Sequence, residues 1–250
     1  MPVRGIPLVR EGDDLAPLIL AALERQGTPL SNGAVLVVAQ KIVSKAEGRR
    51  VALTAVTPGA RALTLAAETH KDSRFVQVVL DESSEVVRTG HDVLIVESRQ
   101  GFICANAGVD HTNAGASEED LTLLPRDADA SAAALRARLR ELRGVEAAVI
   151  ISDTHGRAFR LGAVGVAIGV AGMAALRDLR GQKDLFGHTF RVTTVAVADE
   201  LASAATLVMG EAAEGVPAAL IEGLAVAGDA SGQESGARAL LRPRELDLFR

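Results

Sequence analysis

Short segments rich in valine, isoleucine and alanine recur along this chain, and they constrain its fold more than any other feature of the sequence. Apolar runs of this length, bounded by turn residues such as Gly and Asn, are typical of buried strands. Such strands are predicted at residues 34–39, 145–151, 191–198 and 217–221. A hairpin is predicted from residues 92–97 and 102–105, which are joined by the four polar or small residues 98–101.

Two helices are predicted between these strands. Ser131 is a suitable N-cap for a helix whose leucines repeat at helical spacing until Gly144 ends it. Asp199 is a candidate cap for a second helix that runs to about Met209. Strands mixed with helices in irregular order predict the α+β class with mixed β-sheets, in place of a regular βαβ winding.

The chain has 250 residues, enough for one large domain or two small ones. We expect residues 1–250 to form a single unit, with or without two subdomains. Residues 162–172 place small residues three and four positions apart, which we interpret as tightly packed backbone and not as a nucleotide-binding loop. Residues 228–236 are rich in Gly and polar residues, and we expect an exposed, linker-like segment there.

Composition argues against several functional classes. No window holds about 18 uncharged apolar residues, and charges near the amino terminus precede any apolar run long enough for a signal peptide. We therefore expect a cytoplasmic protein that does not bind membranes. The net charge of −5 and the absence of Trp and Tyr argue against nucleic-acid binding. Cys104 is the only cysteine, so no intrachain disulfide can form.

Familiar catalytic and nucleotide-binding motifs are missing. The sequence contains no P-loop, no G-x-G-x-x-G after a strand, no G-x-S-x-G, no H-E-x-x-H and no paired C-x-x-C. Its five histidines lack the spacing of metal ligands, so a zinc site is not expected.

Lysine is rare in this chain and clusters at one place. Of 27 basic residues, 23 are Arg and four are Lys, yet Lys41 and Lys45 lie close together just after the strand at 34–39. Where a chain otherwise uses Arg, Lys can supply a compact point charge, as beside a phosphate. Chance clustering on a solvated turn is the alternative interpretation.

Three carboxylates follow regular elements and are candidate metal ligands: Asp110, Asp153 and Glu211. Mg²⁺ and Mn²⁺ take oxygen ligands, and phosphate-handling sites often supply one or two carboxylates and a hydroxyl. Asp153 and Thr154, at the end of the strand at 145–151, offer both groups in one turn. Ordinary Asx and Ser/Thr turns produce the same pairs, so this alternative stays open, as it does for Asp110 and Asn113.

Taken together, six segments in order make the chain similar to the coenzyme F420-0:gamma-glutamyl ligase family. The resemblance covers nearly the whole chain, and the motifs are specific as a set although none is specific singly. They are GIPLVREGDDL near the start, VVAQKIVSKAEGR, FVQVVLDESSEVVR, ANAGVDHTN, VIISDTHGRAFRLGAVGVAIG and VADELASAATLVMGEAAEGVPAAL.

The resemblance implies a stand-alone GTP-dependent ligase that adds L-glutamate to coenzyme F420-0 and then further glutamates by gamma linkage. It also implies a family-specific α+β fold, an intertwined homodimer, two divalent ions (magnesium or manganese) and potassium. By the same resemblance, the metal ligands are Asp110, Asp153, Thr154 and Glu211, and the catalytic residues are Lys45 and Asp153. The implied GTP contacts are Ile6, Pro7, Leu8, Val9, Gln40, Lys41, Lys45, Asn113, Met209, Gly210, Glu211, Ala212, Ala213, Glu214, Gly215 and Val216.

The expected reaction transfers the GTP γ-phosphoryl group to a carboxylate of the precursor, and the glutamate amine then attacks the acyl phosphate. Catalysis would depend on positioning and charge neutralisation and not on a protein nucleophile. Two alternatives remain at this point. One is a metal-dependent phosphohydrolase that uses the same carboxylates on water. The other is a non-enzymatic nucleotide- or deazaflavin-binding protein.

Overall fold

A mixed four-stranded sheet forms the centre of the molecule. The computed structural model describes residues 1–115, 117–224 and 236–248. The sheet has the order β11-β1-β7-β8, in which β1 and β7 are parallel and the other neighbours are antiparallel. Its strands are β1 (Val35–Ala39), β7 (Ala148–Arg157), β8 (Arg160–Ala171) and β11 (Ala218–Ile221). The strands predicted at 34–39 and 217–221 are therefore confirmed.

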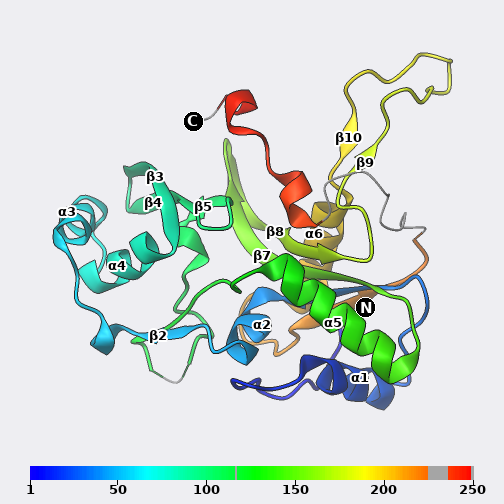
Figure 1. Cartoon of the computed structure of the whole chain (residues 1–250), viewed down its shortest axis with the longest axis horizontal. Helices are drawn as coiled ribbons and strands as arrows, with labels where there is room; N and C mark the ends of the chain where they lie inside the picture. The colour runs from blue at the N-terminus through cyan, green and yellow to red at the C-terminus, as the bar shows by residue number, and fades with distance from the viewer. Residues whose placement is uncertain (116, 225–235, 249–250) are drawn as a thin grey trace.

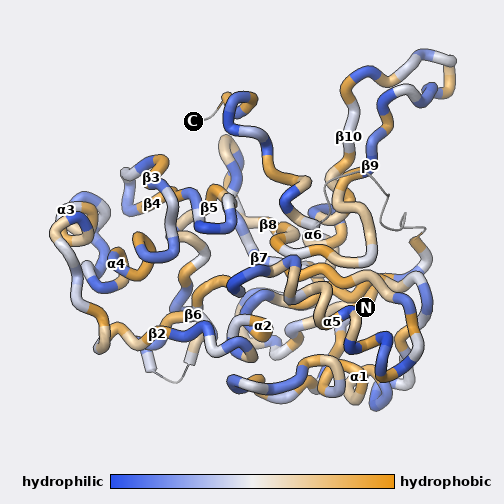
Figure 2. The backbone as a smooth tube through the Cα atoms, in the orientation of Figure 1, coloured by the Kyte–Doolittle hydropathy of each residue, from blue (hydrophilic) through white to orange (hydrophobic). Residues whose placement is uncertain are grey.

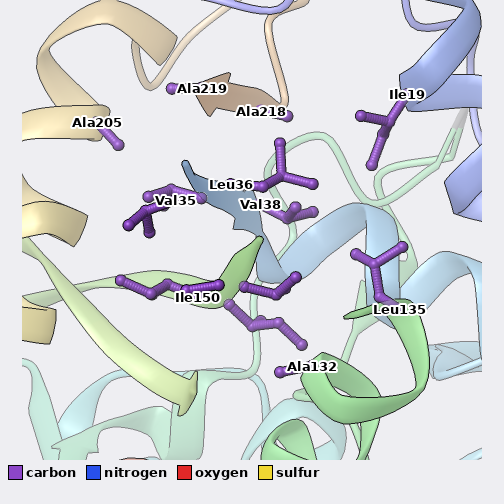
Figure 3. Packing of buried hydrophobic residues seen from close by; sticks show 14 of the residues in the cluster. Ile19, Val35, Leu36, Val38, Ala132, Leu135, Ile150, Ala205, Ala218 and Ala219 are labelled. Carbon is purple, nitrogen blue, oxygen red and sulfur yellow. The ribbon is translucent and has the colours of Figure 1, made fainter. Parts of the chain in front are cut away.

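Helices cover both faces of this sheet, which explains why its inner strands are apolar without alternation. In Figure 3, Val35 points toward Ala205 of α6, whereas its neighbour Leu36 points toward the opposite side, where Ile19 and Leu135 lie. Leu36 and Ile150 are fully buried, and Val35 is too. The covering helices are α1 (Leu15–Arg25), α5 (Ala128–Arg143) and α6 (Val197–Met209), and the short α2 (Gln40–Ala46) follows β1.

A smaller lobe packs its own core beside the main sheet (Figure 1). Its antiparallel sheet has the order β3-β4-β5 and confirms the predicted hairpin as β4 paired with β5. The lobe comprises α3 (Ala60–Thr69), α4 (Ser73–Asp81), β3 (Ser83–Gly90), β4 (Val93–Ser98) and β5 (Ile103–Ala105). A two-stranded ribbon of β2 (Arg50–Ala52) and β6 (Asp120–Thr122) lies between the lobe and the main sheet. Single turns of 3-10 helix occur at Leu53–Ala55, Asn106–Gly108, Ala237–Leu240 and Arg244–Leu246.

An arm projects from the body between β9 (Arg177–Asp178) and β10 (Thr194–Val195) (Figure 1). The strand predicted at 191–198 is confirmed only at Thr194 and Val195, which pair with β9, and its predicted end was wrong because helix α6 already begins at Val197. Hydrophobic residues occur near the tip of the arm, far from both cores (Figure 2). The prediction of the α+β class with mixed sheets is confirmed.

Both predicted helix starts were wrong. Helix α5 begins at Ala128, since the Asp127 carboxylate accepts a hydrogen bond from the Ala130 N–H and caps it. Ser131 lies inside the helix, and its hydroxyl donates to Glu47. Asp199 lies in the first turn of α6, where its carboxylate accepts the Ala167 N–H of β8 at 2.9 Å. The predicted ends of both helices, at Gly144 and Met209, are confirmed.

Small residues in β8 allow two helices to approach its backbone, as predicted for residues 162–172. A Cβ added at Gly165 would lie 2.6 Å from the Ala202 carbonyl oxygen of α6. A Cβ at Gly169 would overlap the Ala128 carbonyl at the start of α5. In the part of the chain that the structure describes, no helix is both long and apolar enough to cross a membrane. The linker predicted at 228–236 lies, except for Gly236, outside the described residues.

The close approach at Gly169 leads to a stability prediction. Gly169→Ala should lower the free energy of unfolding by about 1–3 kcal/mol, because the methyl group must displace the backbone at the start of α5. Gly156→Ala in β7 is the matched control, since no atom lies within 4 Å of a Cβ placed there. Urea unfolding of both variants checks the prediction. Equal stability of the two would show that β8 and α5 can separate without loss.

Candidate active site

A large cavity opens at the edge of the central sheet where β1 ends. It has a volume of about 1150 Å³, larger than the roughly 300–1,000 Å³ of typical small-molecule pockets. The last pair between β1 and β7 joins Ala39 to Ser152, so both parallel strands deliver their following residues to this edge. The carboxyl ends of parallel strands are the usual place for ligand sites in such sheets.

All residues predicted to contact GTP or metal line this one cavity, although they come from five separate parts of the chain. These residues are Ile6, Pro7, Leu8, Val9, Gln40, Lys41, Lys45, Asp110, Asn113, Asp153, Thr154, Met209, Gly210, Glu211, Ala212, Ala213, Glu214, Gly215 and Val216. Their shared location makes one binding site possible, whereas the role of each residue remains a prediction.

Helix α2 carries the two clustered lysines into the cavity. The helix begins at Gln40, directly after β1, so the lysines lie on a helix and not on a solvated turn. Gln40 itself is only 2% exposed, and its Oε1 accepts a hydrogen bond of 2.8 Å from Ser44. The Gln40 Nε2 is buried and has no hydrogen-bond partner among the described residues.

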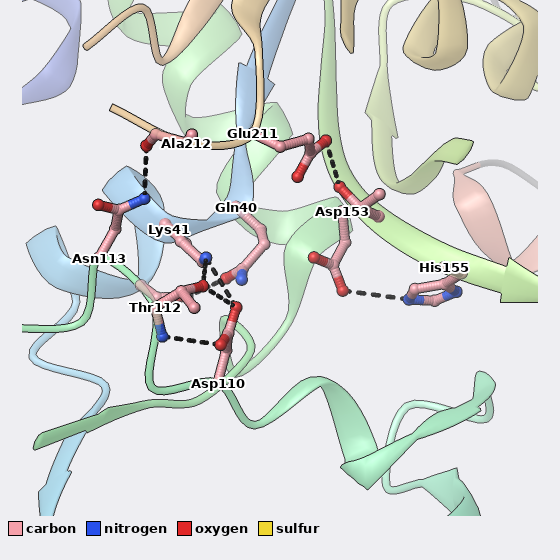
Figure 4. A network of polar contacts seen from close by, with 11 residues as sticks. Gln40, Lys41, Asp110, Thr112, Asn113, Asp153, His155, Glu211 and Ala212 are labelled. Atoms are coloured by element: carbon pink, nitrogen blue, oxygen red, sulfur yellow. Dashed lines mark hydrogen bonds and ion pairs between the residues drawn. The ribbon is translucent and has the colours of Figure 1, made fainter. Parts of the chain in front are cut away.

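The two lysines differ in their partners. Lys41 Nζ lies 2.7 Å from Asp110 Oδ2 and donates to the Thr112 hydroxyl at 2.9 Å (Figure 4). Within the described residues, no carboxylate forms an ion pair with Lys45. Burial lowers the pKa of Lys45, and the positive charges of Arg50 and Lys41 lower it further. An incoming anion would therefore stabilise the protonated form of Lys45.

Asp110 is held as a carboxylate by its neighbours. Its oxygens accept hydrogen bonds from the Thr112 N–H at 2.8 Å and the Thr112 hydroxyl at 2.7 Å. Burial acts to raise the pKa of Asp110, but the hydrogen bonds from Lys41 and Thr112 outweigh it and the net shift is downward. The group is thus ionised at neutral pH and already paired with a cation.

Asp153 was predicted to lie at the end of a strand, but it lies inside β7, which continues to Arg157. Beyond Ser152, β7 continues as a ribbon with β8 alone, so Asp153 is the first residue past the pairing with β1. Its Oδ2 lies 3.1 Å from His155 Nε2, two positions along the same strand, and both side chains are largely buried (Figure 4). The histidine had not been predicted as a site residue, because an i, i+2 contact has meaning only once the strand is known.

The loop after α6 forms the opposite wall. Thr154 Oγ1 donates to Glu211 Oε1 at 2.9 Å, which joins two of the predicted metal ligands. Glu214 instead accepts the Ala212 N–H at 2.8 Å, a contact within its own loop. Asn113 Nδ2 donates to the Ala212 carbonyl at 3.0 Å and so connects this loop with the Asp110 loop (Figure 4).

Several lining residues had not been predicted from the sequence, among them Arg50 and Asp120. Arg50 Nη2 lies 2.9 Å from Asp120 Oδ2, and the two residues come from β2 and β6. No local motif marks either residue, because they meet only through strand pairing.

Burial raises the pKa of the Cys104 thiol to about 12, and the charge of Asp153 contributes to this upward shift. The thiol therefore stays protonated and does not act as a nucleophile.

The oxygen-rich donor set fits a hard divalent cation. Among the described residues, no three His, Cys, Asp or Glu gather tightly enough to hold an ion by themselves. The adjacent Thr154 and Glu211 oxygens, with Asp153 next in the chain, nevertheless supply ligands that Mg²⁺ and Mn²⁺ prefer. Substrate and water oxygens would complete such a site, as is common for Mg²⁺ with phosphates.

Comparison with known proteins gives a consistent result. Residues 5–223 match the family described as F420-0:Gamma-glutamyl ligase. A coenzyme F420:L-glutamate ligase of Methanothermobacter thermautotrophicus is 51% identical over 248 residues, which cover 99% of this chain and 97% of that protein. Ligases of the same name from Methanopyrus kandleri and Archaeoglobus fulgidus are 48% and 45% identical, and each alignment covers at least 99% of this chain and 95% of the relative. Because the similarity extends over the full set of cavity segments, this chain belongs to the F420-0:gamma-glutamyl ligase family.

Proposed function

We propose that this protein is a GTP-dependent ligase that adds L-glutamate to coenzyme F420-0, and then further glutamates by gamma linkage. The observation that carries the proposal is the set of charged groups that line the large cavity. Lys45, which has no carboxylate partner among the described residues, and the oxygen donors of Asp153, Thr154 and Glu211 line the same cavity. This arrangement suits a nucleoside triphosphate, whose phosphates are bound by cationic side chains and by metal ions that the protein holds.

The reaction proceeds in two steps. A carboxylate oxygen of the precursor attacks the γ-phosphorus of GTP, the bond to the β-phosphate oxygen breaks, and GDP leaves. The glutamate amine then attacks the acyl phosphate carbon, loses a proton and expels inorganic phosphate, which leaves an amide. Lys45 neutralises phosphate charge, and the cavity holds the reacting groups close together.

The proposed metal ligands are Asp110, Asp153, Thr154 and Glu211, with Mg²⁺ or Mn²⁺ as two divalent ions and K⁺ as a monovalent ion. When bound, the divalent ions would neutralise phosphate charge and polarise the transferred phosphoryl group. His155 holds one oxygen of Asp153 from the side away from the loop at 211, which leaves the other oxygen for a ligand. Asp110, which is paired with Lys41, would serve as a ligand to a bound divalent ion.

The decisive experiment is incubation with F420-0, GTP, manganese and glutamate, followed by mass spectrometry. The proposal requires a product heavier by glutamate residues and one GDP for each bond formed. GDP release that does not depend on glutamate would indicate the phosphohydrolase alternative instead. Tight binding of GTP or deazaflavin without turnover would indicate a carrier protein.

A homodimer is also proposed, and the arm supports it. Leu185 and Phe186 on the arm are 99% and 86% exposed, although side chains of this size are normally buried. Leu161, at the turn between β7 and β8, is 99% exposed as well. Contact with a second copy of the chain would bury these side chains. In a symmetric dimer the same apolar surface of each copy faces the other copy.

The dimer can be tested at the arm. Leu185→Asp together with Phe186→Asp should convert a dimer into a monomer, because the partner would then have to bury two charges. Sedimentation equilibrium of both proteins measures the change. The exposed Leu248, replaced by Asp, is the control for a general effect of surface charge. A wild-type monomer at micromolar concentration would contradict the proposal.

Removal of the proposed metal ligand Asp153 should abolish most activity. Asp153→Asn should lower the turnover number about 100-fold or more, because charge stabilisation worth several kcal/mol is lost. Thr154→Val should have a milder effect, since water can replace one hydroxyl ligand. Turnover at saturating manganese and circular dichroism check both variants. Near-wild-type turnover in Asp153→Asn would refute the metal assignment.

The two glutamates of the loop after α6 should behave differently. Glu211 is directed to Thr154, whereas Glu214 accepts an N–H within its own loop. Glu211→Gln should therefore raise the manganese concentration needed for half-maximal turnover at least tenfold, and Glu214→Gln should leave it nearly unchanged. Manganese titration of both variants measures this difference. The reverse result would mean that the metal ligand in this loop is Glu214.

A further inference from the structure

Arg50 is a cavity residue to which neither the motifs nor the proposed ligand set assigns a role. It begins strand β2, and its guanidinium lines the cavity with about half of the side chain exposed. Nη2 contacts the Asp120 carboxylate of the paired strand at 2.9 Å. A guanidinium has five N–H donors, and this contact uses only one edge of it. The remaining donors are available at the cavity surface.

The surroundings of Arg50 carry an excess of positive charge. Arg50 and Lys41 both act on Lys45, which has no carboxylate partner among the described residues. Asp120 compensates Arg50 and Asp110 compensates Lys41, so the charge of Lys45 remains uncompensated. The carboxylates Asp153 and Glu211 instead contact His155 and Thr154. Three basic side chains, Arg50, Lys41 and Lys45, thus lie near one another at the cavity, and two of them already have a carboxylate partner.

Gly115 fits the Arg50–Asp120 pair closely. A Cβ at this position would overlap the Asp120 carboxylate and the Arg50 guanidinium. Its backbone conformation does not require glycine, because its φ lies outside the left-handed region. The absent side chain thus serves to leave space for the ion pair. An exposed pair of this kind adds little to stability, so stability alone does not account for the pair.

We propose that Arg50, oriented by Asp120, binds an oxyanion of a substrate next to Lys45 and thereby determines substrate affinity. The inference rests on the proposed ligase function and extends it to a residue outside the implied ligand set. A planar guanidinium pairs with two oxygens of a carboxylate or a phosphate at once. The oxyanion is therefore the carboxylate of the incoming amino acid or a phosphate of the nucleotide, and experiment can separate these two sources.

The test measures two quantities in the full-length protein: the Kd of a non-hydrolysable GTP analogue by calorimetry, and the KM for glutamate at saturating GTP and F420-0. Arg50→Gln should raise one of them by about tenfold to a hundredfold, the effect of losing charge-assisted hydrogen bonds. The turnover number at saturation should change less than threefold. An increase in the Kd assigns the oxyanion to the nucleotide, and an increase in the KM assigns it to the amino acid.

Two further variants separate binding from folding. Arg50→Lys keeps the charge but not the planar fork, so it should raise the same quantity by a smaller factor. Gly115→Ala retains the Arg50 side chain but should displace its guanidinium, and it should raise that quantity as well. Arg244→Gln breaks a 2.6 Å ion pair with Glu85 outside the cavity and should change neither quantity.

The results that would overturn the role of Arg50 differ from those that would refute the ligase function. Wild-type turnover with both quantities within twofold of wild type in Arg50→Gln and Arg50→Lys would overturn the inference and leave the ligase function intact. A fall in turnover with both affinities unchanged would also overturn it. Absence of glutamylated product from the wild-type protein would refute the ligase function itself.

Discussion

The parallel pairing of β1 with β7 is the constraint on which the remainder of the structure depends. Five residue pairs, from Val35 with Ala148 to Ala39 with Ser152, align the carboxyl ends of the two strands. Residues far apart in the sequence therefore leave the sheet at one edge, where α2 starts on one strand and Asp153 follows on the other. Helices on both faces bury these strands, and this burial fixes the register because a shift by one residue would exchange the two faces.

The site built on this edge pairs two of its basic side chains with carboxylates and leaves Lys45 without such a partner among the described residues. Lysine and arginine side chains come from α2 and β2, while the oxygen donors come from β7 and the loop after α6. The spread of these groups over separate segments leaves Lys45 and the carboxylates of Asp153 and Glu211 without an ion pair to one another among the described residues, so they stay available to a ligand. It also explains why no short motif encodes the site, because each segment contributes only one or two groups to it.

Local patterns predicted the parts of the fold whose causes are local. The strands at 34–39 and 217–221 and the helix end at Gly144, whose φ is +66°, are of this kind. The start of α5 was missed because Asp127 and Ser131 are both good caps, and Glu47, distant in sequence, engages the serine. Cavity residues were grouped correctly through family resemblance, whereas Arg50 was missed because its partner lies 70 positions away.

The bond between Asn113 and residue 212 has a consequence for sequence variation. The asparagine donates to a main-chain carbonyl, which every amino acid possesses, so the identity of the side chain at 212 is irrelevant to this contact. Asn113, in contrast, supplies the donor from its own side chain and has a left-handed backbone (φ +53°) that asparagine tolerates better than most residues. The residue at position 212 can therefore vary without loss of this hydrogen bond, whereas variation at position 113 is restricted, although the two loops share the same bond.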